Sequence, residues 1–197
     1  MSDAHSPTDV PHVLARILAE ATGLFVARGY RGISMREIAE AVGISKAGLY
    51  YHFQDKEELF LAILTANLDT VAQIVRAACQ QEAGTRERVA QMLRAILALP
   101  AEQRALIRLA NQEMVHMSAE ARTNFEAIYQ RQFLGQIGEL LQMGIARGEL
   151  RPVNVQLATW LLLGMAYPFF APGHPGEAMS EVVDLIVTVF YDGLGQR

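Results

Sequence analysis

The sequence is short of several residue types, and each shortage excludes a class of protein. A single cysteine, Cys79, among 197 residues rules out an intramolecular disulfide and an all-cysteine metal site. The first fifteen residues contain no Lys or Arg and no apolar run, so no signal or transit peptide is expected. Polar residues and a proline interrupt the apolar stretch 152–176, which leaves too short a run to cross a bilayer. We therefore expect a cytoplasmic protein without a membrane segment.

Positive charge is also scarce. The net charge is −4, whereas nucleic-acid binding usually leaves a basic footprint. The chain has only two lysines, Lys46 and Lys56, and both lie in the same short segment. Between positions 30 and 56 there are four basic and three acidic side chains, which is a small excess. A prediction of DNA binding must therefore rest on a motif and not on charge.

Helical periodicity dominates the chain. Apolar residues recur at helical spacing almost throughout, and no sustained period-two alternation is present. The sequence thus predicts an all-α fold of about nine helices. A disordered tail (1–10), a helix-turn-helix domain (11–55) and a ligand-binding and dimerisation domain (56–197) are expected. The helices beyond the head are expected at about 56–82, 86–98, 101–117, 119–147, 153–170 and 177–194.

Residues 34–56 carry the signals of a helix-turn-helix. Helix starts are marked by Ser34, Ser45 and Asp55, and helix ends by Gly29 and Gly43. Such a motif holds a second helix in the major groove while the first braces it. The inward face of the pair is predicted to hold Ile38, Val42, Ile44 and Leu49. The outward face of the second helix is predicted to hold Lys46, Ala47, Gly48, Tyr50, Tyr51 and His52.

At these residues the chain resembles the TetR family of bacterial repressors. The resemblance rests on Gly29-Tyr30, Ser34-Met35-Arg36-Glu37-Ile38-Ala39, Gly43-Ile44-Ser45 and Leu49-Tyr50-Tyr51-His52-Phe53 followed by Lys56. It implies that residues 46–52 enter the major groove, and it implies phosphate contacts from Tyr50, Tyr51, His52 and Lys56. Contacts with the DNA backbone from Ser34, Arg36 and Ser45 are implied as well. The sequence departs from the family in lacking a basic N-terminal arm and in having Gly48 where Ser or Thr is common.

The resemblance also implies a small-molecule effector of unknown identity that releases the protein from a DNA operator, and it implies no cofactor. A mixture of Met, aromatic and aliphatic residues suggests an adaptable apolar pocket with a few polar anchors. Ordinary core packing is the alternative reading of the same pattern. The candidate pocket residues are Met92, Ile96, Leu109, Gln112, Glu113, His116, Phe125, Tyr129, Phe133 and Trp160.

A homodimer is expected because two recognition helices about 34 Å apart meet successive turns of a palindromic site. The last two helices have wide apolar faces, which favours their pairing with the same helices of a second copy. Burial within one chain is the alternative. The predicted interface consists of Leu157, Leu161, Gly164, Met165, Met179, Val182, Val183, Ile186, Val187 and Phe190.

Two other function classes compete with a regulator. Glu113 and His116 form the E-x-x-H pair that di-iron helical bundles use, but those sites need a second such pair, and no other histidine follows a Glu by three residues. No nucleophile elbow or phosphate loop is present. A nucleoid or division-control DNA-binding protein of the same fold is the second alternative. We expect a DNA-binding repressor and no enzyme.

Overall fold

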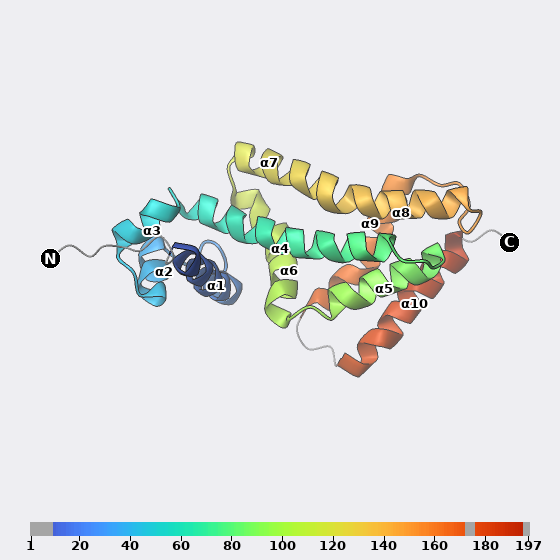
Figure 1. Ribbon diagram of the computed structural model, residues 1–197, viewed down its shortest axis with the longest axis horizontal. Coiled ribbons are helices and arrows are strands. Elements are labelled where there is room, and N and C mark those ends of the chain that lie inside the picture. The colour runs from blue at the N-terminus through green and yellow to red at the C-terminus, as the bar shows by residue number, and fades with distance from the viewer. Residues whose placement is uncertain (1–9, 172–175, 195–197) are drawn as a thin grey trace.

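The computed structural model describes residues 10–171 and 176–194, and the regular structure within these ranges is entirely helical (Figure 1). Residues 1–9 of the expected tail lie outside the described ranges, and Val10 begins the first helix. The all-α fold class is confirmed. The helices are α1 (Val10–Arg28), α2 (Met35–Val42), α3 (Lys46–His52), α4 (Lys56–Cys79), α5 (Thr85–Leu97), α6 (Ala101–Glu113), α7 (Ala119–Tyr129), α8 (Gly135–Ala146), α9 (Val155–Ala166) and α10 (Gly176–Leu194).

The helix boundaries in the head follow from local capping. Ser34 forms a capping box with Glu37, and Ser45 and Asp55 accept hydrogen bonds from the backbone N–H groups three residues on. Gly43 ends α2 in the left-handed region with a φ of 75°, where its N–H donates to carbonyls of the last turn. The predicted start and stop signals of the head are thus confirmed.

Two hydrophobic cores share the helix α4. The core of the head contains Ile17, Phe25, Ile38 and Leu49, together with residues from the first half of α4 and from α6 and α7. The core of the body contains the second half of α4 packed with α5, the π-helical segment Gln130–Leu134, α8, α9 and α10. By length and composition α4 resembles a membrane-spanning helix, but its large apolar residues are packed in these two cores. Figure 1 shows α4 running from the head into the body.

The helix expected at 119–147 contains a π-helical segment. Residues Gln130–Leu134 join α7 to α8 with the Gly135 N–H donating to the Gln130 carbonyl, five residues back. A Cβ at Gly135 would lie 3.1 Å from that carbonyl oxygen, so the absence of a side chain eases the close approach. Counting α7, the π-helical segment and α8 as one bent helix gives the nine expected helices within the described residues.

The helix expected at 56–82 ends at Cys79, and two further helices end four residues earlier than predicted. The helix expected at 101–117 ends at Glu113 and continues as the 3-10 turn Met114–His116. The helix expected at 153–170 ends at Ala166, and Tyr167–Phe170 form another 3-10 turn. Pro168 explains the last change, because proline has no N–H to donate within an α-helix.

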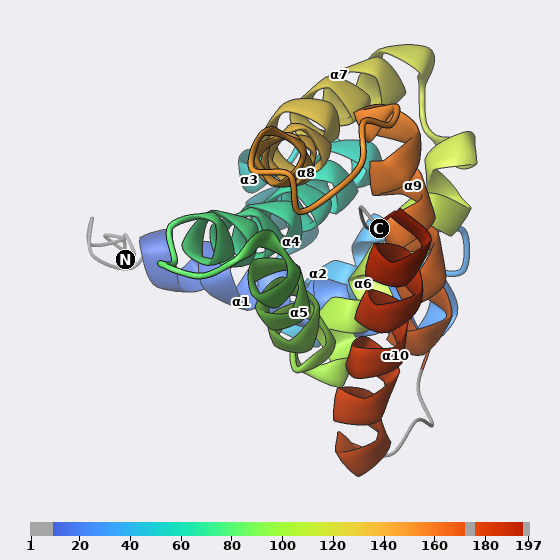
Figure 2. The ribbon, with the colours of Figure 1, turned by 90° about the vertical axis from the view of Figure 1, so that its right-hand side faces the viewer.

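The structure corrects the predicted dimer interface at four apolar residues of α10. Val183, Ile186, Val187 and Phe190 are buried within the chain, on the side of α10 that packs against α5 and α9 (Figure 2). Arg94 of α5 donates to Asp184 at 2.7 Å and fixes this side further. The periodicity of α10 could not distinguish its two apolar faces, because Leu185 and Val189 widen the apolar stripe.

An exposed apolar face remains on the outer layer formed by α9 and α10. Leu157 and Leu161 are 61% and 64% exposed, and Leu185 and Val189 are also exposed. A Cβ at Gly164 would meet no atom within 4 Å, so this side of α9 is open. Of the other predicted interface residues, Met165, Met179 and Val182 are half-buried. We call Leu157, Leu161, Leu185 and Val189 the outer apolar face.

The positive φ of Gly43 predicts a stability effect. Gly43→Ala should lower the free energy of unfolding by about 1 kcal/mol, because an L side chain is strained in the left-handed region. The matched control is Gly193→Ala in α10, where a Cβ meets no atom and helix propensity favours Ala. Urea denaturation followed by circular dichroism measures both variants. Equal stability of the two would contradict this account of the turn.

Candidate nucleic-acid interface

The inner face of the α2–α3 pair holds the two helices together. Ile38 and Leu49 have no exposed surface, Val42 and Ala39 are buried, and Ile44 is half-buried against the same core. Backbone N–H groups of Gly43 and Ile44 both reach the Ala39 carbonyl, which makes the turn tight. All four apolar residues predicted to face inward do so. α3 is therefore presented on the surface by a rigid support.

The outer face of α3 is aromatic and polar. Tyr51 is 83% exposed, and Lys46, Ala47 and Tyr50 are exposed too. His52 is half-buried and its ring lies edge-on to the Tyr51 ring, with the centroids 5.2 Å apart. The Lys46 Nζ lies 5.6 Å from the centroid of the Tyr50 ring. The helix thus offers hydroxyl, imidazole and ammonium donors, which suit phosphate oxygens and base edges.

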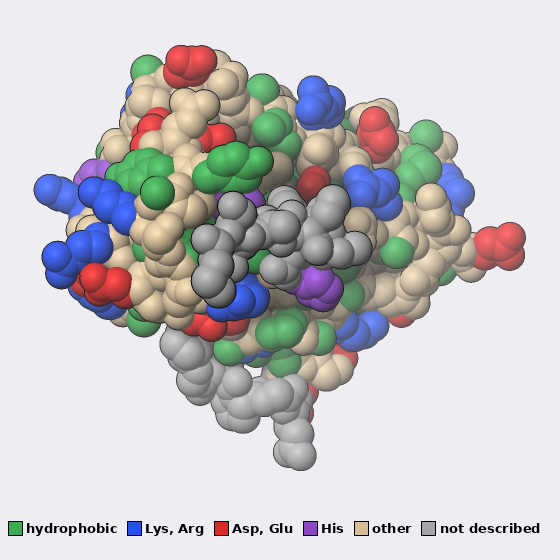
Figure 3. All heavy atoms as spheres, turned by 60° about the vertical axis from the view of Figure 1, so that its left-hand side comes forward, with side chains coloured by type: hydrophobic (Ala, Val, Ile, Leu, Met, Phe, Trp, Pro, Cys, Tyr) green, Lys and Arg blue, Asp and Glu red, His purple; other side chains and the backbone are tan. Residues whose placement is uncertain are grey.

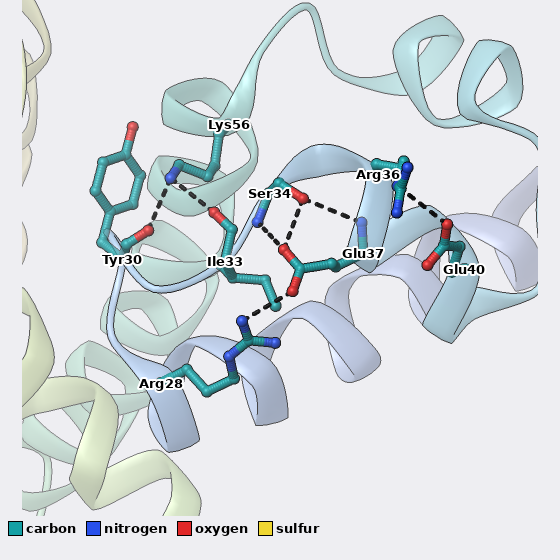
Figure 4. Close-up of polar contacts among 8 residues, drawn as sticks. All are labelled: Arg28, Tyr30, Ile33, Ser34, Arg36, Glu37, Glu40 and Lys56. Carbon is teal, nitrogen blue, oxygen red and sulfur yellow. Dashed lines mark hydrogen bonds and ion pairs between the residues drawn. The ribbon is translucent and has the colours of Figure 1, made fainter.

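The hydroxyls of Ser34 and Ser45 are used in helix capping. The Ser34 Oγ donates to Glu37 Oε2 at 2.7 Å, and the Ser45 Oγ accepts from the Gly48 N–H at 3.0 Å. Arg28 donates to the other oxygen of Glu37 at 2.8 Å, as Figure 4 shows. The hydrogen bond from Ser34, followed by that from Arg28, lowers the pKa of Glu37 to about 2. Both serines therefore position α2 and α3.

Arg36 projects from α2 into solvent. Its Nε lies 3.2 Å from Glu40 Oε1, one helical turn on, and both side chains are largely exposed (Figure 4). An exposed pair of this kind contributes little to stability, so the guanidinium exchanges partners at low cost. Arg36 is consequently available to a phosphate beside α3.

Lys56 points inward, unlike the other candidate DNA contacts. Its Nζ donates to the carbonyl oxygens of Tyr30 and Ile33, at 2.8 Å each (Figure 4). The same ammonium lies 4.4 Å from the centroid of the Tyr30 ring. Burial lowers the pKa of Lys56, and the carboxylates of Glu113 and Glu37 oppose that shift. Lys56 thus fastens the turn between α1 and α2 to the start of α4.

Basic and acidic side chains both lie on the face that Figure 3 shows. Several Lys and Arg side chains gather at its left edge with acidic side chains beside them, and others lie singly across the face. The mixture of signs agrees with the net charge of −4. A DNA contact at this face therefore depends on individual side chains more than on net positive charge.

A cavity of about 680 Å³ lies in the body, a size typical of small-molecule sites. Five predicted residues line it: Ile96, Phe125, Tyr129, Phe133 and Trp160. Rings of Phe125, Tyr129 and Phe133 follow one another along the bent helix, with centroids 6.4 and 5.4 Å apart. The wall is completed by Leu64, Asn67, Leu68, Val71, Leu106, Ile107, Ala110, Asn111, Met114, Glu126, Gln130, Leu163, Gly164, Tyr167 and Phe170.

The structure places the other five predicted pocket residues outside this wall. Met92 is fully buried in the body core, and Leu109 packs in the core of the head. Gln112 and His116 are exposed. Glu113 accepts a hydrogen bond from the Tyr30 N–H at 3.3 Å. The sequence missed the polar wall residues because Asn67 and Asn111 lie within apolar helical stretches whose orientation depends on packing.

The E-x-x-H pair has no further ligands beside it. His116 Nε2 lies 3.9 Å from Glu113 Oε2, and Glu113 also serves the α1–α2 turn. Within residues 10–171 and 176–194, no group of three His, Cys, Asp or Glu side chains is arranged to hold a metal ion. The pair is thus accounted for by its contacts in the fold.

Comparison with known protein families gives two matches. Residues 17–63 match the family described as bacterial regulatory proteins, tetR family, and residues 82–167 match the tetracyclin repressor-like C-terminal domain. The first match covers the helix-turn-helix, and the second covers most of the cavity wall. Together they extend over both parts of the chain.

Curated relatives include repressors that match over nearly the whole chain. The repressor KstR2 of Rhodococcus jostii is 27% identical over 185 residues, covering 90% of this chain and 89% of that protein. The repressor AcnR of Corynebacterium diphtheriae is 29% identical over 187 residues, covering 92% and 93%. The activator FasR of Mycolicibacterium smegmatis is 40% identical, but only over 74 residues, 38% of this chain and 34% of that protein.

Solved structures agree with this assignment. The TetR-family regulator PfmR of Thermus thermophilus is 28% identical with a TM-score of 0.75, covering 87% of this chain and 97% of that chain. AibR, solved with isovaleryl coenzyme A and operator DNA, is 27% identical with a TM-score of 0.75, covering 90% and 97%. The chain belongs to the TetR family of transcriptional regulators.

Proposed function

We propose that the protein is a cytoplasmic repressor that binds a palindromic DNA operator as a homodimer and is released by a small, mostly apolar effector. The observation that carries the proposal is the outer face of α3, where Tyr50, Tyr51 and Lys46 are exposed on a helix that Leu49 anchors in the core. Repression is favoured over activation because KstR2 and AcnR match over about 90% of this chain.

Roles within the DNA-binding face follow from exposure. Lys46, Ala47 and Gly48 form the first turn of α3, where a small helix surface allows close approach to base edges. Tyr50, Tyr51 and His52 are proposed to contact phosphates, as is Arg36 of α2. Lys56 is proposed to act by fixing the α1–α2 turn, because two carbonyls already accept hydrogen bonds from its ammonium group.

The outer apolar face is the proposed dimer surface. A monomer in water gains nothing from exposing Leu157, Leu161, Leu185 and Val189 on adjacent helices, whereas a second copy buries them. The open side of α9 at Gly164 lets a partner helix approach closely. Two copies would then present two α3 helices to one palindromic site.

Effector release requires a connection between cavity and head, and two polar contacts supply one. Helix α6 lines the cavity, and Glu113 at its end accepts from the Tyr30 N–H in the α1–α2 turn. Helix α7 also lines it, and Ser118 at its start donates from both N–H and Oγ to Glu57 of α4, at 2.7 Å each. To turn 99% binding-competent protein into 1%, an effector must favour the released form by about 10⁴-fold.

Substitutions on α3 separate positioning from base selection. Tyr51→Ala should weaken binding to all DNA sequences alike, whereas Lys46→Ala should change the preferred base and cost about tenfold on the best site. The measurement is selection of bound sites from random DNA followed by binding titrations. Arg147→Ala, at the far end of the body, is the matched control. Wild-type affinity and preference in both α3 variants would refute the assignment of this helix.

The two lysines should differ in their salt dependence. Lys46→Ala removes a positive charge from the DNA-binding surface of the protein. It should reduce the slope of log affinity against log salt concentration by about one per subunit. Lys56→Ala should keep the slope and instead lower the free energy of unfolding by about 1–2 kcal/mol, because two carbonyls lose their donor. Binding titrations across a salt series and urea denaturation test the pair. A reduced slope with unchanged stability would assign Lys56 to a phosphate.

The dimer surface is tested by a charge. Leu161→Glu should convert the protein to monomers at micromolar concentration, because a carboxylate cannot be buried there unpaired. The matched control is Val115→Glu, since Val115 is similarly exposed at 66% but lies on the turn after α6. Sedimentation velocity distinguishes the two states. Dimers that persist in Leu161→Glu would move the interface elsewhere.

A further inference from the structure

The wall of the cavity is nearly free of charge. Among its described residues there is no Lys, Arg or His, and Glu126 is the one carboxylate. Neither arginine of α6 lines it: Arg104 donates to the Leu97 and Leu99 carbonyls, at 2.7 and 3.0 Å, and Arg108 is half-buried outside the wall. An anionic group inside this cavity would therefore find no cation in the wall.

Tyr129 reports on the same environment. Tyr129 lines the cavity, and desolvation by burial raises the pKa of its phenol to about 12. No charged side chain contributes to that shift. A negative charge is thus disfavoured at the phenol oxygen, and the same physical cost applies to a ligand carboxylate placed beside it.

Asn67 lines the cavity, but its amide faces the protein. Its Nδ2 donates to the Gln103 carbonyl at 3.3 Å, which fixes the orientation of the amide because a carbonyl only accepts. Its Oδ1 has no hydrogen-bond partner among the described residues, but the atom has almost no accessible surface, so a ligand in the cavity does not reach it. The selectivity of the wall therefore rests on its apolar surface and on the absence of a cation.

We propose that the cavity takes an uncharged apolar ligand, or the uncharged part of a larger one, and that it rejects a buried carboxylate or phosphate. This inference rests on the proposed effector function and specifies the chemistry of the effector. An alkyl amide, ester or alcohol fits it, whereas the ionised carboxylate of equal length does not. A charged portion of a larger ligand must stay outside the wall.

The probes are decanamide, methyl decanoate and decanoate, which share one chain length and differ in the head group. Trp160 is the only tryptophan of the chain and lines the cavity, so its fluorescence reports occupancy in the full-length protein. At pH 7.5 decanamide should bind at least tenfold more tightly than ionised decanoate. Methyl decanoate, which is also uncharged, should likewise bind at least tenfold more tightly than decanoate.

A pair of Asn→Lys variants tests the electrostatic cause. Asn111→Lys places an ammonium at the exposed edge of the wall and should reduce the preference for decanamide over decanoate at least threefold. Asn124→Lys adds the same charge on the exposed side of α7, outside the wall, and should leave the preference unchanged. Decanoate binding as tightly as decanamide to the wild-type protein overturns the inference, as does an equal effect of the two variants. A Trp160 signal that responds to none of the probes overturns it too.

Operator release, followed by fluorescence polarisation of labelled DNA in the same titrations, separates this inference from the proposed function. If decanoate binds more tightly and releases the DNA, the proposed function stands and the neutral-ligand inference fails. If decanamide binds with the expected preference but the DNA stays bound, the inference stands and effector release by such ligands fails.

Discussion

Burial of α4 in two hydrophobic cores constrains the rest of the molecule. Its first half, with Leu59 and Phe60, completes the core of the head, and its second half, with Val71 and Val75, completes the core of the body. Protein cores are close-packed, so neither half shifts without disturbing its neighbours. Lys56 fixes the beginning of this helix to the α1–α2 turn. The position of α3 on the surface is thus tied to packing in the body.

Much of the head could be predicted from sequence because its signals are local. Ser34, Ser45 and Gly43 act within one or two turns of their own helices, and the inward residues of the helix pair follow from spacing alone. The helices of the body could be predicted from the sequence, but the residues that line its cavity could not. Which face of α10 packs inward, and whether Met92 or Asn67 reaches the cavity, depends on contacts between helices distant in sequence.

Lys56 shows the same limit within the motif itself. The residue type and its place at a helix start suggest a phosphate contact. The ammonium group instead donates to the carbonyls of Tyr30 and Ile33, which lie more than twenty residues away in sequence. The π-helical segment is a further case, because its unusual hydrogen bonding has no signal beyond Gly135. Gln130 and Phe133 of this segment and Tyr129, which precedes it, all line the cavity.

Trp160 belongs to the cavity wall and is also nearly half exposed on α9, beside Leu157 and Leu161. If two copies associate through this face, one indole contacts both the effector and the neighbouring subunit. Effector binding and dimerisation then form a thermodynamic cycle. The factor by which dimerisation changes the affinity for the effector equals the factor by which the effector changes the affinity between subunits. Effector affinity becomes a function of protein concentration, and dilution alone changes the sensitivity of the response.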